Sequence, residues 1–412
     1  MKNETFQTQS TPTIVFTFAG LTLSVTAFLV GSNVGMNLPL GLGILVIIIG
    51  NIILALYSGF IGVIGQSTRK PSIMISKPAF GNYGQIITST IVVIFLMGFV
   101  AVYSSMIGTL INTMFPQVPA LAGNLAFIIC ITLTTVSGFK GMSLLSKIGL
   151  PCLFVFVLYG LYQVNAQIGL SAVLEKTPVS NLGIGLIISQ VISVWTAAAT
   201  FSSDMTRFAK KRKDVFIITF LAFSCTAVLE SVGLICALGT GKGDLVAILQ
   251  GLDIMAVALL IYLLLMWTSA QSLLYSFSLA FQDIAGVVTK GKSKASREVW
   301  VILGGIVAFA GSVVMTLYGL TSSFNAFLLT VGIAIPSIGG ILIAHYFVVQ
   351  RNFETAFDNI PNVRIVAFVS WLAGIVVAKF VSWGIPAING LLTAAILYSI
   401  LGLAAKNKAE KS

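Results

Sequence analysis

Apolar runs of bilayer-spanning length recur along almost the whole chain. Each approaches or exceeds the roughly 20 residues that a helix needs to cross the hydrocarbon core of a membrane. Only 8% of the 412 residues are charged, whereas a soluble domain carries about 25%, so a water-soluble fold is excluded. We predict an all-α polytopic membrane protein with about twelve transmembrane helices, near residues 12–36, 41–66, 85–114, 119–138, 146–166, 182–203, 214–239, 252–282, 298–319, 324–349, 363–379 and 384–404.

Lysine and arginine gather on one side of this predicted layout. Of the 23 basic residues, all but Lys176, Lys242 and Lys379 fall at the termini or in loops on the terminal side. Because basic residues are retained in the cytoplasm, both termini are expected there, with the protein in the plasma membrane. The net charge of +11 is then explained by membrane topology and does not indicate nucleic-acid binding. Membrane lipid is an expected partner, and nucleic acid is not.

The loops between the runs are too short to hold a soluble domain. One transmembrane domain is expected over 12–404, between cytoplasmic tails at 1–11 and 405–412. The sequence contains no G-x-x-x-x-G-K-[ST] phosphate loop, which argues against an ATP-driven motor. The sequence shows no paired acids, no nucleophile with a base and no metal cluster of the kind that would indicate an enzyme. The pattern favours a transporter that works as a monomer.

Spans one and six share small and hydroxylated residues that their neighbours lack. These lie at 20–27 and 31–35 in span one, and at 193–204 around Trp195 in span six. A discontinuous helix needs such residues because its released backbone groups require partners and room; the alternative is close helix packing. A period of five spans predicts two inverted repeats, with repeat one at about 12–166, repeat two at about 182–349, and extra helices at about 363–404.

Span eight places hydroxyl and amide groups at membrane depth. Trp267 is followed by Thr268, Ser269, an alanine and Gln271. Hydroxyl oxygens beside backbone carbonyls suit a hard cation such as Na+, as oxygen ligands suit calcium. Alternatively, the two hydroxyls bond back to carbonyls of the preceding turn.

With these residues placed, the chain resembles the nucleobase–cation symporter family, closest to its cytosine-permease branch. The resemblance covers nearly the whole chain. It implies a five-plus-five inverted repeat with discontinuous helices 1 and 6, plus two C-terminal helices. It rests on the order and spacing of short motifs: Gly20-Leu21-Thr22, Ile49-Gly50-Asn51 with Tyr57, Ser203-Asp204-Met205-Thr206-Arg207-Phe208, Trp267-Thr268-Ser269, and residues 334–340 followed by Arg351.

The resemblance also implies two binding sites. Na+ is expected as the coupling ion, with no other cofactor, between spans one and eight at Gly20, Leu23, Leu265, Thr268 and Ser269. The heterocyclic substrate is expected between spans one, three, six and eight, at Ser24, Leu96, Phe99, Trp195, Ala197, Ala198 and Gln271.

Three positions depart from the cytosine-permease pattern. Leu96 replaces a glutamine, Phe99 replaces a tryptophan, and Ala270 stands at the asparagine position, with Gln271 adjacent. A planar ring can still stack on Phe99 or Trp195. A lost hydrogen-bond partner costs about 1–3 kcal/mol, which is enough to change the preferred base. The expected substrate is therefore a cytosine-like pyrimidine, a purine or a thiamin-precursor pyrimidine.

Other polar residues within the spans leave alternatives open. Glu230, deep in span seven, is either a proton site or a protonated, hydrogen-bonded structural residue. Asp204 and Arg207 form an interfacial ion pair or helix-end contact, or else belong to an inner gate. Asn325 is an outer-gate residue or a cap, and His345 is expected to pack.

These patterns together predict a secondary active transporter that imports a nucleobase or related heterocycle by Na+ symport with alternating access. The alternatives are a proton-coupled permease that uses Glu230 for a different small polar solute, and a non-transporting membrane sensor. No cytoplasmic domain is predicted that would carry a sensor's signal.

Overall fold

The computed structural model describes residues 8–136, 155, 158–243, 245–251, 255–289, 295–353, 355–358 and 360–409. Within these ranges the chain is helical and contains no strand. The predicted span at 146–166 lies partly outside the described residues, and its remainder is helical from 158.

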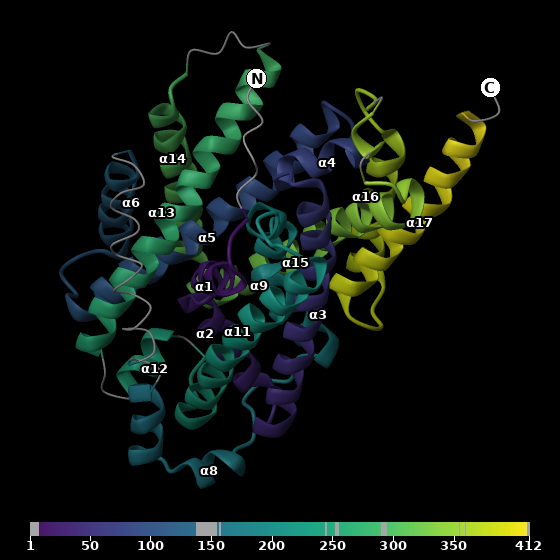
Figure 1. The fold of residues 1–412 in the computed structure, drawn as a ribbon. Coiled ribbons are helices and arrows are strands. Elements are labelled where there is room, and N and C mark those ends of the chain that lie inside the picture. Colours follow the sequence, from purple (N-terminus) through teal and green to yellow (C-terminus); the bar gives the residue numbers. More distant parts are fainter. Residues whose placement is uncertain are drawn as a thin grey trace.

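The described helices follow the predicted spans in order (Figure 1). The first part of the chain forms α1 (Thr11–Thr22), α2 (Val25–Asn37), α3 (Leu40–Thr68), α4 (Ser72–Phe80), α5 (Gly84–Met114), α6 (Ala120–Val136) and α8 (Leu170–Leu174). The middle part forms α9 (Ile184–Thr200), α10 (Ser203–Thr206), α11 (Arg212–Thr240), α12 (Leu245–Gly251) and α13 (Met255–Val288). The last part forms α14 (Arg297–Tyr318), α15 (Leu320–Ala344), η1 (His345–Gln350), η2 (Thr355–Phe357), α16 (Ile365–Phe380) and α17 (Pro386–Ala409).

Several of these helices have the length and apolarity of membrane spans. Among the described residues, 6 helices pass both criteria, and the bent pair of α1 and α2 makes 7 if it counts as one span. The predicted all-α polytopic class is confirmed. The number of twelve spans and the inverted repeat stay predictions.

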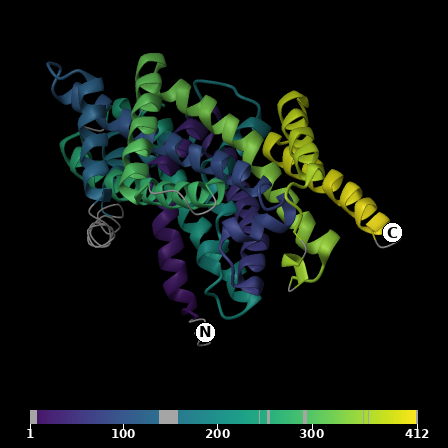
Figure 2. The same cartoon turned by 90° about the horizontal axis from the view of Figure 1, so that it is seen from above.

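The spans pack into a bundle with a pair of helices on one flank. Helix α2 packs against α11, which also packs against α3, while α5 packs against α6, α13 and α14. Helices α16 and α17 pack on each other and on α15, and they project at one side in both views (Figures 1 and 2). Helices α8 and α12 lie at the opposite end of the molecule from α4.

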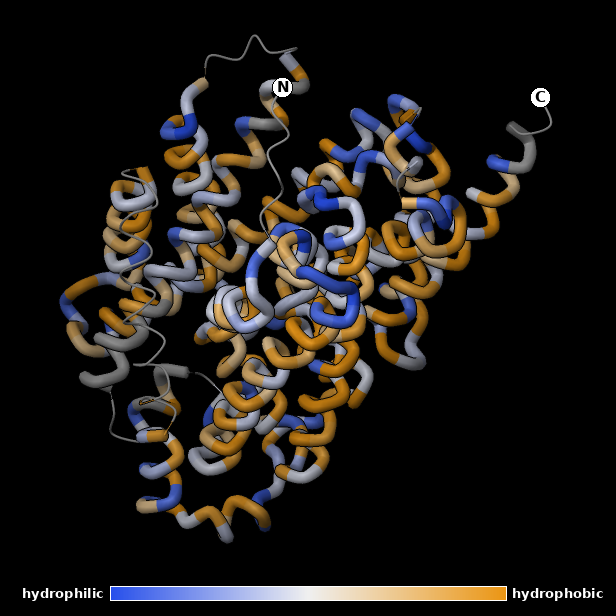
Figure 3. Tube along the Cα trace, viewed as in Figure 1, coloured by the Kyte–Doolittle hydropathy of each residue, from blue (hydrophilic) through white to orange (hydrophobic). Residues whose placement is uncertain are grey.

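Exposed side chains on the spans suit a lipid surround. Along α3, Leu45, Ile48, Ile52 and Leu56 are 51%, 45%, 43% and 41% exposed. Their spacing of three or four residues places them on one helix face. Hydrophobic residues follow the helices over most of their length, as Figure 3 shows. In water such a face would be costly, but against lipid tails it is favourable.

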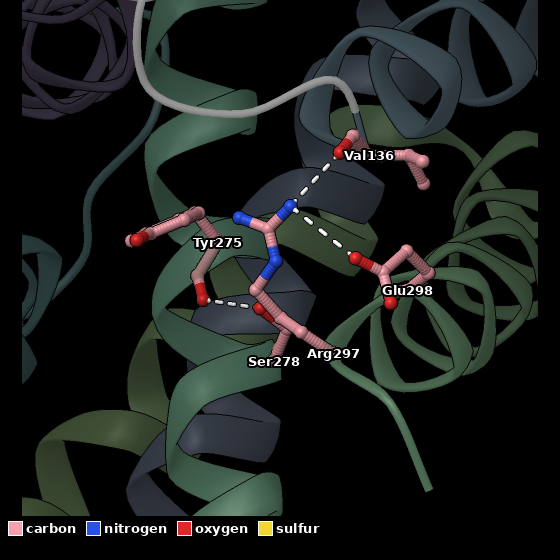
Figure 4. A network of polar contacts seen from close by, with 5 residues as sticks. All are labelled: Val136, Tyr275, Ser278, Arg297 and Glu298. Carbon is pink, nitrogen blue, oxygen red and sulfur yellow. Dashed lines mark hydrogen bonds and ion pairs between the residues drawn. The ribbon is translucent and has the colours of Figure 1, made fainter.

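An arginine joins three helices. Arg297, at the start of α14, donates from Nη2 to the carbonyl of Val136 at the end of α6 (2.8 Å) and lies 3.8 Å from Glu298 (Figure 4). Its guanidinium also stacks 5.2 Å from the ring of Tyr275 on α13. A cation at a helix C-terminus satisfies a carbonyl that the helix leaves unpaired. The two helix ends, of α6 and α14, are both on the predicted cytoplasmic side.

Helices α2 and α11 approach so closely that their backbones touch. A Cβ atom at Gly31 would lie 1.8 Å from the carbonyl oxygen of Glu230, and one at Gly233 would lie 2.1 Å from that of Phe28. Only glycine allows such an approach, as in small-residue packing between transmembrane helices. The second half of span one is therefore seated directly on α11.

Gly31→Ala is expected to destabilise the protein by at least about 1–3 kcal/mol, the usual cost of overpacking, because the added methyl group meets backbone and not a flexible side chain. The measurement is the midpoint of thermal unfolding in detergent. Gly41→Ala is the matched control, since a Cβ atom there meets nothing within 4 Å. Equal midpoints for the two variants would contradict the close approach.

Candidate functional site

Span one is broken between Thr22 and Val25. The axes of its two halves differ by 64°, and Ser24 at the junction is extended, with φ −134° and ψ 167°. Within the junction, the Ser24 and Thr26 hydroxyls are 2.6 Å apart. The predicted discontinuity of the first span is therefore present, and it lies beside the predicted site residues.

The break releases two backbone carbonyls from the helical ladder. Ser24 N–H donates to the carbonyl of Thr22 (3.0 Å), whereas an unbroken helix would use that of Gly20. Ala27 N–H donates to Ser24 (3.0 Å), whereas a helix would use Leu23. Released carbonyls at membrane depth require other partners. They are the backbone oxygens predicted to bind Na+.

Tyr103 on α5 joins the broken span to α13. Its hydroxyl donates to Ser24 Oγ at 3.4 Å and also faces the hydroxyls of Thr26 and Ser269. The structure thus brings Ser24 and Ser269, one from each predicted site, around one buried phenol. Sequence reasoning missed Tyr103. A tyrosine four residues after Phe99 was the available signal, because that spacing places both on one helix face.

The same face of α5 carries Leu96 and Phe99. Both are buried, at 9% and 5% exposure. Phe327 on α15 meets Phe99 edge-on, with ring centroids 5.0 Å apart and an interplanar angle of 82°. Between Leu96 and Tyr103, this face therefore offers apolar and aromatic surface, with a hydroxyl at Tyr103.

Span six breaks inside the predicted segment 193–204, after Ala197. Helix α9 continues to Thr200, and the carbonyl of Ala197 accepts from Phe201 N–H at 3.1 Å. The ladder breaks one residue later, because Ser202 N–H donates to Ala199 (3.2 Å) and so leaves the carbonyl of Ala198 out of the helical register. Asp204 N–H likewise donates to Phe201 (3.0 Å) and not to Thr200, so the carbonyls of Ala198 and Thr200 are both out of register.

Two predicted substrate residues carry a buried polar atom without a partner. Trp195 is 7% exposed and its Nε1–H makes no hydrogen bond, while Gln271 is 1% exposed and its Oε1 accepts none. An unsatisfied buried polar group costs about 1–3 kcal/mol, so native structures rarely keep one without a reason. One group is a donor and the other an acceptor.

The remaining predicted ion ligands lie on α13. Thr268 is 8% exposed, and its carbonyl accepts from the Ser272 hydroxyl at 3.0 Å. Leu265 lies about one turn earlier on the same helix, and its side chain is outside the described set. Trp267 points away from these residues' partners in spans one and three, because its Nε1 donates to Thr134 on α6 at 3.1 Å.

Polar contacts close the predicted extracellular end of the bundle. Asn33 on α2 donates to Gln190 on α9 and accepts from Asn325 on α15 at 3.4 Å. Asn37 accepts from Leu182 N–H at 3.0 Å. A surface cavity of about 630 Å³ lies beside this end, lined by Asn37, Leu38, Pro39, Leu42, Pro178 and residues 180–184.

At the predicted cytoplasmic end, α10 is bound to the start of α4. Asp204 accepts from Ser72 N–H at 2.7 Å, which is a helix-end contact. Within the described residues it forms no ion pair with Arg207. Hydroxyls line a small hollow between α4, α5, α9 and α15, formed by Ser72, Ser76, Thr88, Ser89, Val92, Thr200, Phe201, Ile338 and Leu342.

Comparison with known proteins identifies the family. A family model described as permease for cytosine/purines, uracil, thiamine, allantoin matches residues 3–401. The chain belongs to this family. The cytosine permease of Escherichia coli strain K12 is 25% identical over 395 residues, which cover 94% of this chain and 90% of that protein.

Solved structures of other transporters have the same fold as this chain. The inward-facing conformation of Mhp1 matches with a TM-score of 0.82 at 15% identity, covering 99% of this chain and 95% of that one. Mhp1 in a closed conformation with bromovinylhydantoin bound, a nucleobase-cation-symport-1 family transporter, matches at 0.75 and 16%, covering 98% and 94%. A Na+-coupled sialic acid symporter matches at 0.69 and 13%, covering 96% and 89%. Family and fold are those of integral membrane transporters and not of enzymes.

Tyr103→Phe is expected to lower stability by about 0.5–1.5 kcal/mol, the net worth of a typical hydrogen bond, because the permease loses the hydroxyl that links α5 to Ser24. The measurement is again the thermal midpoint in detergent. Tyr83→Phe is the control, since that side chain is 47% exposed. A Tyr103 variant as stable as this control would show that the contact contributes nothing.

Proposed function

We propose that this permease imports a flat nucleobase-like heterocycle together with Na+, by alternating access. The observation that carries the proposal is the pair of unpartnered buried groups, Trp195 Nε1–H and Gln271 Oε1. A ring that presents an acceptor to the indole and a donor to the amide would satisfy both. Nucleobases and their relatives carry such carbonyl and N–H groups side by side on a planar ring.

The apolar face of α5 narrows the choice of ring. Phe99 would stack it, while the Trp195 N–H, Ser24 and the released carbonyl of Ala198 would read its edges. Leu96 offers no hydrogen bond, so a substrate edge directed there must be apolar or it loses about 1–3 kcal/mol. One similar protein is a cytosine permease, and Mhp1 has been solved with bromovinylhydantoin bound. A cytosine-like pyrimidine, a purine or a thiamin-precursor pyrimidine is the proposed class.

The proposed Na+ site uses oxygen atoms from spans one and eight. The released carbonyls of Gly20 and Leu23 supply two ligands, and the hydroxyls of Thr268 and Ser269 two more, with the carbonyl of Leu265 as a fifth. Neutral oxygens suit a hard monovalent cation. Because the ion would brace span one against span eight, and span one also borders the substrate, ion and substrate binding are coupled reciprocally.

The proposal also includes the location and orientation of the protein. It lies in the plasma membrane, and the basic residues on the terminal side of the layout favour cytoplasmic termini. The monomer contains every proposed ligand, so it is the proposed working unit.

Replacing both Thr268 and Ser269 with alanine is expected to abolish the stimulation of uptake by a sodium gradient, because two of the proposed ligands are removed. The measurement is uptake of labelled base into proteoliposomes at fixed pH, with and without the gradient. Ser276→Ala, on the exposed face of the same helix, is the control. Undiminished stimulation in the folded double variant rules out this ion site, and uptake driven only by a proton gradient rules out sodium coupling.

Gln271→Leu is expected to weaken substrate binding about 5- to 150-fold, since about 1–3 kcal/mol is lost when a ligand's polar group has no partner. The measurement is a thermal-shift titration with nucleobases and thiamin-precursor pyrimidines, because a ligand at 100 times its Kd stabilises by about 2.7 kcal/mol. Trp195→Phe keeps an aromatic side chain and removes the indole donor. If neither variant changes any ligand's shift, the substrate lies elsewhere.

A further inference from the structure

One buried acid of the bundle plays no part in the proposed sites. Glu230 on α11 is 0% exposed, and its Oε2 accepts from Asn51 Nδ2 on α3 at 2.6 Å. Its other oxygen, Oε1, has no partner, and neither has Asn51 Oδ1. The Glu230–Asn51 pair therefore contains two buried acceptor oxygens to which no group donates a hydrogen bond.

The orientation of the Asn51 amide does not depend on the state of the acid. Its Nδ2 also donates to the carbonyl of Ile47 at 3.0 Å. A carbonyl can only accept, so the nitrogen must lie on that side and the oxygen on the other. Turning the amide over would leave two acceptors facing each other at Ile47.

A charged carboxylate at this position has nothing to balance it. The described helices packed against α11 are α1, α2, α3, α8, α12 and the helical stretch 158–167. Their titratable side chains are Tyr57, which bonds to Thr200, and Tyr159 and Tyr162, and none of these supplies a positive charge. On α11 itself the bases are Arg212 and Lys213, about 25 Å away at 1.5 Å per residue. The remaining titratable groups of α11 are Asp214, Cys225 and Cys236, and none supplies a positive charge. Buried charges without a partner are strongly disfavoured.

We propose that Glu230 holds a proton throughout the transport cycle and, paired with Asn51 as acid and amide, is a positioning residue for the broken first span. The proton on Oε1 supplies the missing donor, and Asn51 Oδ1 is the unpartnered acceptor beside it. The pair fixes α11 on α3. The backbone of Glu230 also contacts Gly31 of α2. The pair therefore fixes the position of the surface against which the second half of span one packs. This role rests on the proposed function and gives Glu230 no part in ion coupling.

Infrared spectroscopy of the purified permease tests the proton directly. The difference between wild type and Glu230→Gln is expected to contain the C=O band of a protonated carboxylic acid at neutral and mildly alkaline pH, although a free glutamate ionises near 4.3. Asn51→Leu is expected to shift that band, because it removes the hydrogen-bond partner. Absence of the band at neutral pH overturns the proposal. This readout requires no transport, so it stands or fails independently of the substrate and of Na+.

Uptake separates a positioning role from proton coupling. Glu230→Gln mimics the neutral acid and is expected to keep at least half of the wild-type rate, with the same pH profile. Glu230→Leu and Asn51→Leu each leave one buried polar partner and are expected to reduce the yield of folded protein several-fold. The double variant is expected to recover it, since replacing both partners is often near neutral. A folded Glu230→Gln protein with a changed pH profile, or additive losses in the double variant, contradicts the proposal.

Discussion

Hydrocarbon offers no hydrogen bonds, and for that reason the break between α1 and α2 governs the arrangement around it. A helix that opens there must find partners for its carbonyls and room for its turn. Tyr103 approaches from α5, Ser269 from α13, and the glycine contacts with α11 hold the second half in place. The candidate site consists of the polar groups that surround this opened backbone. A bound cation and a polar heterocycle would satisfy those that remain without partners.

The spans and the first discontinuity could be predicted because each depends on local sequence. Hydropathy over some twenty residues is enough to identify a span. Small residues on both sides of Ser24 are enough to indicate a break. The same reasoning places the opening of span six within 193–204 but does not give the residue at which the helix breaks. Ser193, Thr196 and Thr200 each bond back to a carbonyl four residues earlier, so their hydroxyls are satisfied inside an intact helix. Alanine, the strongest helix former, continues it.

The contacts that decide the site's details join residues far apart in the chain. Periodicity assigns Tyr103 to the same face as Phe99 but does not say that Ser24 lies opposite. Asn51 and Glu230 are 179 positions apart, and the local sequence around either residue does not predict contact with the other. A single sequence specifies which faces are polar, whereas which faces meet depends on packing among all the spans. The same limit applies to Trp195 and Gln271, whose lack of a partner becomes visible only in three dimensions.

The backbone contact between α2 and α11 bears on how the protein is made. The two helices are separated by more than 170 residues of sequence, so the ribosome completes span one long before its seat exists. During that interval the face of α2 around Gly31 must remain in the membrane without its final neighbour, the backbone of Glu230. Non-local pairing of this kind slows assembly and exposes intermediates. The first half of the chain therefore depends for its maturation on the second, and truncation after span five would leave a broken helix with no surface to close on.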